Sequence, residues 1–451
     1  MPARRSPLCL LFLFAICVPH TISKVSAEKS LPSFLYTSAG RYEPLAWMHG
    51  ADRFPSGAAV WLCDSSGRRP LVPKFAASAD SSVSFDGQRV LFAGRLKVQD
   101  PWQIWELSLT GREPRRVTNG IGDCVRPFYL PEDRLVFACR VTGRFVIEVA
   151  NLADGKPMPL TFGPANFLPT DVLRDGRILF EAGYPLGSDA TPEIYTVYSD
   201  GSGVESYRCD HGSSRNQGRQ IGSGDVVFAS HNGLAKFTSA QARQVSVPAP
   251  AGEYAGEVSE AKTGEWLLSW RPNAKAPFQL MLWRPGSSKL HLAESAQNTN
   301  IIQPVLIQER ELPHRHPSGL HEWPNANLLC LNAYTSKYRF AAGSIHSTRF
   351  YTRDASGNPK LLGTAPVESD GSFFVQVPTE QPLQIELLDR SGRTLKRESG
   401  FFWMRRGEQR ACVGCHAGPE TAPENAVPMI LLKSTTPADM TGETRNASGG
   451  H

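Results

Sequence analysis

The chain has 451 residues, with 48 Lys and Arg against 43 Asp and Glu, which gives a formal net charge of +5 at pH 7. This balance is close to neutral, and the sequence contains no long basic run. It argues against nucleic acid as a partner, because binding to a phosphate backbone requires a basic patch.

The N-terminus has the features of a cleaved secretory signal peptide. Arg4 and Arg5 precede an apolar run over residues 8–18, and small residues follow at 25–27, where a signal peptidase would cleave. A bilayer-spanning helix needs about 20 apolar residues, so this run is too short, and no later segment is long and apolar enough. We predict that residues 1–27 are removed and that the mature protein is periplasmic or secreted, with no transmembrane segment.

Removal of residues 1–27 takes away three basic residues and no acidic ones, so the net charge of the mature chain falls to +2. A lipoprotein signal ending at Cys17 is the alternative, although Ile16 stands where a small residue is expected.

A polar turn that leads into an apolar strand recurs five times between residues 36 and 310. The repeats end 45, 43, 48 and 41 residues apart, at Phe92, Phe137, Phe180, Phe228 and Ser269. This period is typical of a four-stranded propeller blade. We therefore expect the aromatic residues of these strands to belong to the core.

Three phrases carry a resemblance to the blades of TolB-like (WD40-like) propellers: Ser84-Phe85-Asp86-Gly87, Ile104-Trp105-Glu106-Leu107 and Pro114-Arg115-Arg116-Val117-Thr118. The resemblance covers residues 70–210 and becomes loose after that. It implies an all-β fold with a β-propeller. Five repeats are visible, and residues 36–69 and 295–330 could each supply another blade, so we expect six or seven blades.

Cys124 and Cys139 flank a predicted turn at residues 131–133. Export would permit a disulfide between them across one hairpin. The alternative is two buried thiols that pack as small hydrophobic side chains.

The segment over residues 312–324 is rich in proline and contains His314, His316 and His321. We predict an irregular connection between two domains. Its histidines are either solvated or ligands of a metal.

Short strands with alternating burial are predicted over residues 328–334, 347–351, 371–378 and 383–389. They indicate a small β-sandwich-like domain. We expect its last strand, over residues 400–404, to lead directly into the motif that follows.

That motif is Cys412-Val413-Gly414-Cys415-His416, the attachment signature of a c-type haem. Two thiols at this spacing can each form a thioether to the porphyrin, and the adjacent imidazole can bind the iron. A four-ligand zinc site would need a second cysteine pair downstream, and none follows Cys415. We predict one covalent haem c held by Cys412 and Cys415, with His416 as the iron ligand.

Residues 365–375, 387–389 and 402–416 resemble the middle domain of the hydrazine synthase alpha subunit. The resemblance spans about residues 320–432, followed by a predicted disordered tail at 433–451. It implies a propeller paired with a haem-binding domain, but not hydrazine synthesis, because the synthase subunit carries further haem-binding sequence and works with partner subunits. In that family a tyrosine shortly after the motif binds the iron. Residues 417–420 contain no tyrosine, so His416 remains the expected ligand.

The sixth ligand of the iron is left open among six side chains: His314, His316, His321, His346, Met404 and Met429. A site with no sixth ligand is the alternative. Arg405, Arg406 and Arg410 could pair with the haem propionates or be solvated, and Trp403 could cover the ring edge.

These features predict an exported mono-haem c-type cytochrome that transfers electrons and uses the propeller to dock a redox protein. The alternatives are a haem enzyme acting on a small molecule and a TolB-like interaction module without a redox role. No hydrolase, zinc-protease or nucleotide-binding motif occurs in the chain. The sequence leaves the oligomeric state open.

Overall fold

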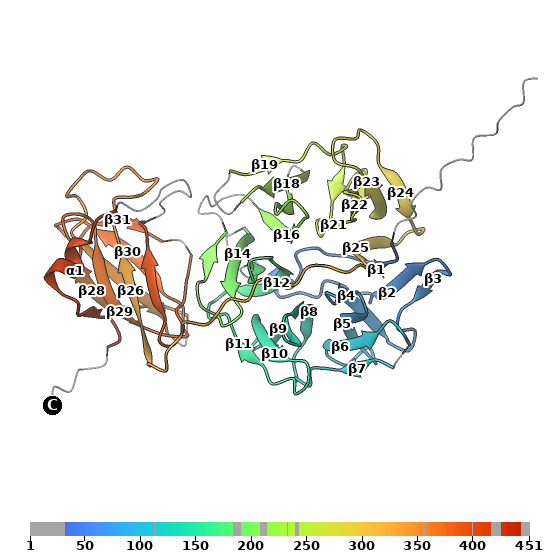
Figure 1. Cartoon of the computed structure of the whole chain (residues 1–451), viewed down its shortest axis with the longest axis horizontal. Coiled ribbons are helices and arrows are strands. Elements are labelled where there is room, and N and C mark those ends of the chain that lie inside the picture. The colour runs from blue at the N-terminus through green and yellow to red at the C-terminus, as the bar shows by residue number, and fades with distance from the viewer. Residues whose placement is uncertain are drawn as a thin grey trace, which may run out of the picture. The chain divides into compact units, whose positions relative to one another are not determined.

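The computed structural model of the chain describes residues 32–111, 113–183, 191–207, 214–231, 233–239, 243–354, 357–398, 400–415 and 425–442. The predicted signal peptide at residues 1–27 lies outside this part. Strands dominate the described residues (Figure 1), whose helical elements are the short η1 (Trp47–His49) and α1 (Met429–Lys433). Neither is long and apolar enough to cross a membrane.

Six sheets lie within the described residues between 34 and 306. The first contains β1 (Phe34–Ala39), β2 (Ala59–Asp64), β3 (Gly67–Pro70) and β25 (Asn300–Leu306). The second contains β4 (Ala77–Val83), β5 (Arg89–Arg95), β6 (Gln103–Ser108) and β7 (Arg115–Arg116). The third contains β8 (Cys124–Leu130), β9 (Arg134–Val141), β10 (Arg144–Asn151) and β11 (Met158–Pro159).

The fourth sheet contains β12 (Asn166–Val172), β13 (Arg177–Gly183), β14 (Glu193–Tyr198) and β15 (Glu205–Ser206). The fifth contains β16 (Arg215–Gln220), β17 (Val226–Ser230), β18 (Gly233–Phe237) and β19 (Val245–Ser246). The sixth contains β20 (Glu253–Tyr254), β21 (Ser259–Glu260), β22 (Trp266–Arg271), β23 (Gln279–Trp283) and β24 (His291–Glu294). All six are antiparallel, and together they confirm the predicted propeller fold.

The ends of this repeat region combine in one sheet. β25 pairs with β1 and also contacts β4, while the first strands β4, β8, β12 and β16 contact one another in turn. This corrects the expectation that residues 36–69 and 295–330 supply separate blades. Pairing the first and last strands closes the ring and covers sheet edges that would otherwise be exposed.

The five repeat-ending residues lie at matching places in β5, β9, β13, β17 and β22. Each is at most 1% exposed, which confirms that they belong to the core: Phe92, Phe137, Phe180, Phe228 and Ser269. They are buried because each sheet packs its apolar faces against its neighbours.

Buried polar side chains link the first strands of different sheets. Arg126 on β8 forms an ion pair with Glu257, and its backbone N–H donates to Asp80 Oδ2 on β4 (3.2 Å). Gln303 on β25 donates through Nε2 to the other Asp80 oxygen (2.5 Å), and Arg53 approaches the same oxygen at 3.8 Å. All five side chains are buried, so the interior of the ring is joined by charge as well as by apolar packing.

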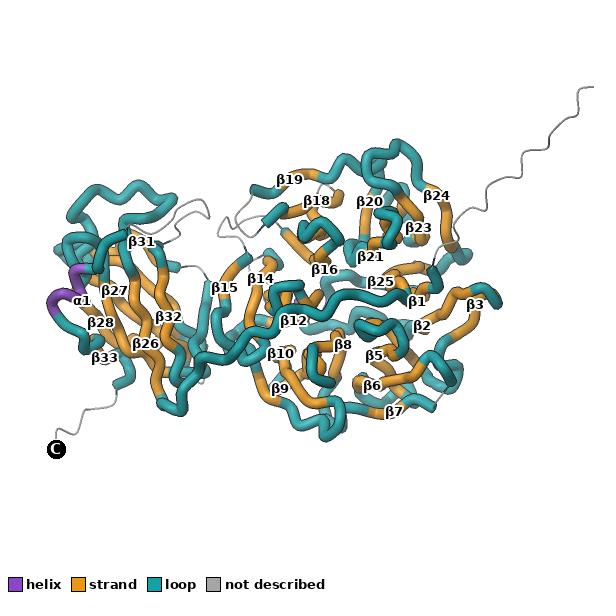
Figure 2. Tube along the Cα trace, viewed as in Figure 1, coloured by secondary structure: helices purple, strands orange, loops and turns teal. Residues whose placement is uncertain are grey.

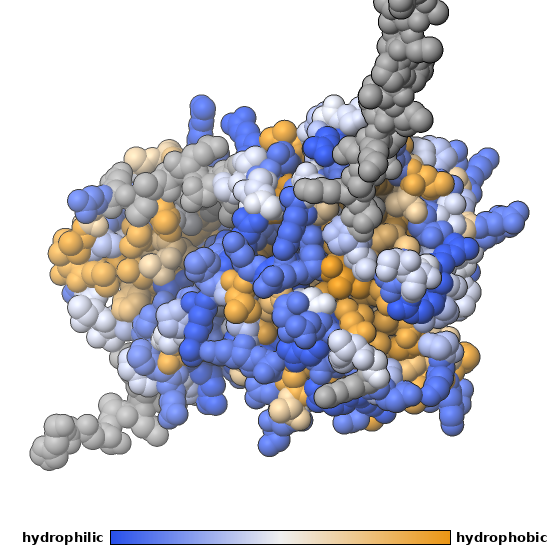
Figure 3. All heavy atoms as spheres, turned by 45° about the vertical axis from the view of Figure 1, so that its right-hand side comes forward, coloured by the Kyte–Doolittle hydropathy of each residue, from blue (hydrophilic) through white to orange (hydrophobic). Residues whose placement is uncertain are grey.

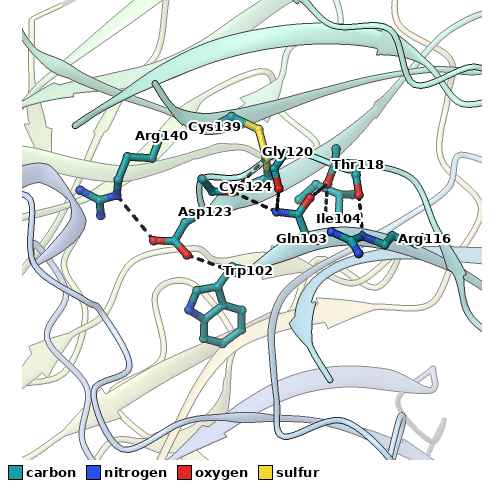
Figure 4. The surroundings of a disulfide bond; sticks show 11 residues. Trp102, Gln103, Ile104, Arg116, Thr118, Gly120, Asp123, Cys124, Cys139 and Arg140 are labelled. Atoms are coloured by element: carbon teal, nitrogen blue, oxygen red, sulfur yellow. Dashed lines mark hydrogen bonds and ion pairs between the residues drawn. A yellow bond between two sulfur atoms is a disulfide. The ribbon is translucent and has the colours of Figure 1, made fainter. Parts of the chain in front are cut away.

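Cys124 on β8 lies directly opposite Cys139 on β9, and the two form a disulfide (Figure 4). Of the two alternatives, the structure contains the disulfide and not two separate thiols. Beside it, Asp123 accepts a hydrogen bond from the Trp102 backbone N–H (3.1 Å) and faces Arg140 at 3.5 Å.

Two four-stranded sheets follow the propeller and confirm the predicted sandwich. One contains β32 (Gln409–Cys412), β26 (Asn325–Cys330), β29 (Phe373–Pro378) and β33 (Ala438–Asp439). The other contains β28 (Pro359–Pro366), β27 (Ser347–Arg353), β30 (Gln384–Leu388) and β31 (Thr394–Arg397). Figure 3 shows hydrophobic side chains gathered on part of the sandwich surface, and its exposed residues include Leu361, Val427 and Leu432.

Two expectations about this region need correction. Residues 400–404 do not form the expected strand. The strand next to the motif is β32, which lies later in the chain, pairs in parallel with β26 and includes Cys412 itself. The tail predicted from residue 433 starts too early, because β33 pairs with β29 and Met440 is buried in the sandwich core. A two-residue strand has too short a pattern to be recognised in a sequence. Residues 443–451 lie outside the described part.

Trp403 anchors the sandwich to the propeller. Its indole is 1% exposed and packs among the rings of Phe162, Phe167 and Phe180, with centroids 6.4, 5.5 and 6.4 Å away. These phenylalanines belong to a core cluster built from β8–β14, so a side chain of the C-terminal module completes the propeller core.

The buried carboxylate of Glu408 makes a second link. Its Oε1 accepts hydrogen bonds from the Gly203 backbone N–H of the propeller (3.1 Å) and from Arg410 Nη2 (2.6 Å). Its Oε2 accepts the Arg405 backbone N–H (2.8 Å). One side chain therefore holds together the fourth propeller sheet and the residues at the start of β32.

We expect Arg126→Met to destabilise the propeller, because it leaves Glu257 buried without its ion-pair partner. Breaking a buried pair on one side typically costs about 3–5 kcal/mol. The measurement is the urea concentration at half-unfolding, which should fall. Arg41→Met is the control, because Arg41 pairs with Glu43 at an exposed position and exposed pairs contribute little. Equal midpoints for the two variants would contradict a structural role for the buried cluster.

We expect Trp403→Ala to loosen the sandwich from the propeller, because it leaves a large void in a packed cluster. Truncating a buried tryptophan typically costs about 3–5 kcal/mol. Limited proteolysis should release the sandwich from this variant faster than from the wild type. Trp323→Ala removes an indole that is 56% exposed and should leave the cleavage rate unchanged.

The surroundings of Glu386 predict that the stability of the sandwich depends on pH. Burial raises the pKa of this carboxyl, but hydrogen bonds from Thr394 (2.7 Å) and Tyr351 (2.9 Å) and the charge of Arg397 outweigh burial and hold the pKa below its usual value. A lowered folded-state pKa adds stability above the unfolded pKa, about 4.3, and the gain is lost as pH falls through the folded value.

Glu386→Gln should therefore unfold at a lower urea concentration than the wild type at pH 7, and the difference should shrink under acidic conditions. The control is Glu322→Gln, at an exposed position. A difference that stays constant down to pH 3 would show that the hydrogen bonds matter and the charge does not.

Candidate functional site

A cavity of about 820 Å³ lies between the sandwich and the fourth propeller sheet. Cofactor sites typically measure roughly 300–1,000 Å³. The sandwich contributes mainly apolar residues from both of its sheets: Leu328, Cys330, Phe373, Ile385, Leu387 and Phe402. The propeller contributes Tyr195, Tyr198 and residues 202–206, and the connection between the modules contributes His316, Pro317, Gly319 and Leu320.

Both cysteines of the sequence motif line this cavity. β32 ends at Cys412, whose carbonyl accepts the backbone N–H of Leu331 (2.8 Å), and Cys415 lies on the turn that follows. The parallel pairing with β26 brings these cysteines to the cavity wall. His416, the predicted iron ligand, lies outside the described residues.

Gly414, between the two cysteines, lies so close to neighbouring backbone atoms that no side chain fits at this position. A Cβ at this position would lie 2.1 Å from the Thr335 carbonyl oxygen and 2.8 Å from that of Asn332. The turn can therefore pack against residues 332–335 only with glycine at this position.

A third cysteine that the sequence did not single out belongs to the same wall. Cys330 lies directly opposite Cys412 in the β26–β32 ladder and is 3% exposed. Burial raises the pKa of the Cys330 thiol well above its usual value, and the neighbouring Cys412 and Cys415 raise it further. Burial likewise raises the pKa of Cys412. Only the strand register reveals this cluster, because 82 residues separate Cys330 from Cys412.

Of the six proposed sixth ligands, His316 alone lines the cavity. His314 donates its backbone N–H to the Arg174 carbonyl (2.7 Å), and His321 packs on Trp323. His346 donates its backbone N–H to the Leu388 carbonyl (2.8 Å).

The two methionine candidates lie elsewhere in the sandwich. Met404 is fully buried in its core, and Met429 accepts a hydrogen bond from the Ser369 hydroxyl (3.2 Å).

The connecting segment from residue 307 to 324, visible as a long loop in Figure 2, reaches the cavity along the propeller. Arg310 donates its backbone N–H to the Phe85 carbonyl (2.8 Å), and His314 follows with its bond to Arg174. Gly176 permits this path, because a Cβ there would lie 2.2 Å from the His314 carbonyl oxygen. At the cavity, the imidazole of His316 stacks on Tyr198 with ring centroids 3.6 Å apart and planes 14° from parallel.

The arginines and the tryptophan near the motif have different surroundings. Arg405 forms an ion pair with Glu380 (3.1 Å), and Arg406 is exposed. Arg410 lines the cavity while its guanidinium bonds Glu408 and the Trp403 carbonyl. Trp403 is buried in the propeller core cluster and does not line the cavity. Its packing in that cluster attaches the sandwich to the propeller.

The described residues contain no group of three or more His, Cys, Asp or Glu side chains arranged to hold a metal ion. The described cavity thus offers three thiols, one imidazole, two phenols and several charged side chains on a mainly apolar lining.

Residues 333–417 match the family described as the hydrazine synthase alpha subunit middle domain. No curated protein matches the chain. Among solved structures, a chain of Kuenenia stuttgartiensis hydrazine synthase is similar, with a TM-score of 0.76 and 16% identity over 89% of this chain and 71% of that chain. TolB from Acinetobacter baumannii gives a TM-score of 0.46 and 11% identity over 61% of this chain and 67% of that one. The likeness to the hydrazine synthase chain, at this identity, shows a shared fold.

Proposed function

We propose that this protein is an exported, mono-haem c-type cytochrome that transfers electrons. The observation that carries the proposal is that Cys412 and Cys415, at the spacing of a haem attachment motif, line one cofactor-sized cavity. Export is supported by the signal-like sequence at residues 1–27 and by the Cys124–Cys139 disulfide, since disulfides persist outside the reducing cytosol.

The residues of the cavity fit a porphyrin. Cys412 and Cys415 would hold it through thioethers to its vinyl groups, and His416 would bind the iron. The partly exposed apolar side chains Ile385, Phe402 and Val413 offer the surface that a flat macrocycle requires. When bound, the haem supplies one-electron chemistry at the iron.

The rest of the cavity wall would shape that chemistry. Apolar residues of both sandwich sheets exclude water, and a dry environment influences the reduction potential of a haem. Residues 202–206 of the propeller line the side of the cavity that the sandwich does not form, so the propeller is part of the site. The propeller would also offer a surface on which a redox protein docks.

The test is expression with the signal peptide in a host that matures c-type cytochromes. After acid–acetone extraction, the wild-type chain should retain one haem, measured by its pyridine haemochrome spectrum. Cys412→Ser/Cys415→Ser should retain none, because both thioethers are lost. Cys63→Ser, which changes a cysteine outside the cavity, should retain haem like the wild type.

A colourless wild-type protein from a host that matures a reference cytochrome c would refute the haem proposal. If haem is present, electron transfer predicts a reversible one-electron titration of its visible spectrum. Turnover of a small molecule by the purified protein would instead favour the enzyme alternative.

A further inference from the structure

We infer that His316 is the iron ligand on the haem face turned toward the propeller, which makes the site six-coordinate. The inference rests on the proposed haem. It goes beyond it by assigning the residue that sequence left open among six candidates.

The residues that line the cavity point to His316. The attachment cysteines belong to the sandwich, so a porphyrin held by them has its other side toward the residues of β14, β15 and the connecting segment. Among the described lining residues, His316 is the one histidine and there is no methionine. Histidine and methionine are the usual axial ligands of c-type haems.

Three other lining residues with donor atoms are less suitable. Cys330 lies directly opposite Cys412 in the β26–β32 ladder, so it belongs to the sandwich side of the cavity and not to the propeller side. Lys396 places its Nζ over the ring of Tyr338, 4.2 Å from the centroid. The Tyr198 ring is covered by His316 itself.

The position of His316 is fixed before any ligand is bound. The backbone hydrogen bond of His314 to the Arg174 carbonyl (2.7 Å) holds the preceding part of the segment on the propeller. Stacking on Tyr198 sets the plane of the imidazole. A ligand held in this way loses little conformational freedom on binding, which favours coordination.

The ring nitrogens of His316 are also available. Within the described chain no hydrogen bond is formed by its imidazole, while its neighbours His314 and Arg315 are engaged with Arg174 and Glu132. A neutral imidazole carries one nitrogen lone pair that can bind iron. A site with two imidazole ligands suits electron transfer, because no coordination position is left for a small molecule.

The experiment compares haem-loaded wild type, His316→Ala and His314→Ala. Electron paramagnetic resonance of the ferric protein should show a low-spin wild type and a high-spin His316→Ala. Carbon monoxide should bind the reduced His316→Ala readily and the wild type poorly. His314→Ala, two residues away on the same segment but outside the cavity, should behave as the wild type. Added imidazole should return His316→Ala to low spin, and a circular dichroism spectrum equal to that of the wild type would exclude misfolding of the variant.

His316→Met provides an independent check. It should stay six-coordinate and show a higher reduction potential than the wild type, because a methionine ligand raises the potential of a haem. A high-spin wild type, or a His316→Ala spectrum that matches the wild type, would overturn the assignment while leaving covalent haem in place. Absence of covalent haem from the wild type would overturn the proposed function and the assignment together.

Discussion

The carboxylate of Glu408 is the point on which the arrangement of this protein depends. It is 5% exposed and accepts backbone N–H groups from Gly203 and Arg405 as well as the guanidinium of Arg410. A buried carboxylate is stable only when such partners satisfy it. These bonds join the fourth propeller sheet to the strand that ends at Cys412, so the same interaction positions one wall of the cavity against the other.

Three kinds of interaction stabilise the propeller: backbone hydrogen bonds, buried ion pairs and packing against Trp403 of the sandwich. Pairing of β25 with β1 closes the ring through backbone hydrogen bonds, while Arg126, Glu257 and Asp80 connect its first strands through charge. Trp403 then fills a gap in the propeller core from the neighbouring module. The propeller therefore supports the residues that it presents at the cavity, chiefly Tyr198.

A site built at such a junction has consequences for function. The thiols come from one module, whereas the stacked pair of Tyr198 and His316 comes from the other module and from the connection between them. Separating the modules would open the cavity and withdraw Trp403 from the propeller core. The reactivity of a cofactor held by Cys412 and Cys415 would then depend on packing at Trp403 and Glu408.

The sequence alone determined the features that local patterns report. The 41–48-residue spacing of buried strand ends predicted the propeller, alternation predicted the sandwich, and Cys412 to His416 predicted the attachment motif, because burial and covalent chemistry both impose short, fixed spacings. Tertiary structure decided which distant segments meet. Ring closure by β25, the place of Cys330 beside Cys412, the packing of Trp403 and the position of His316 at the cavity all depend on strand register and module docking. Such contacts join residues tens to hundreds of positions apart, and no periodicity in the chain records them.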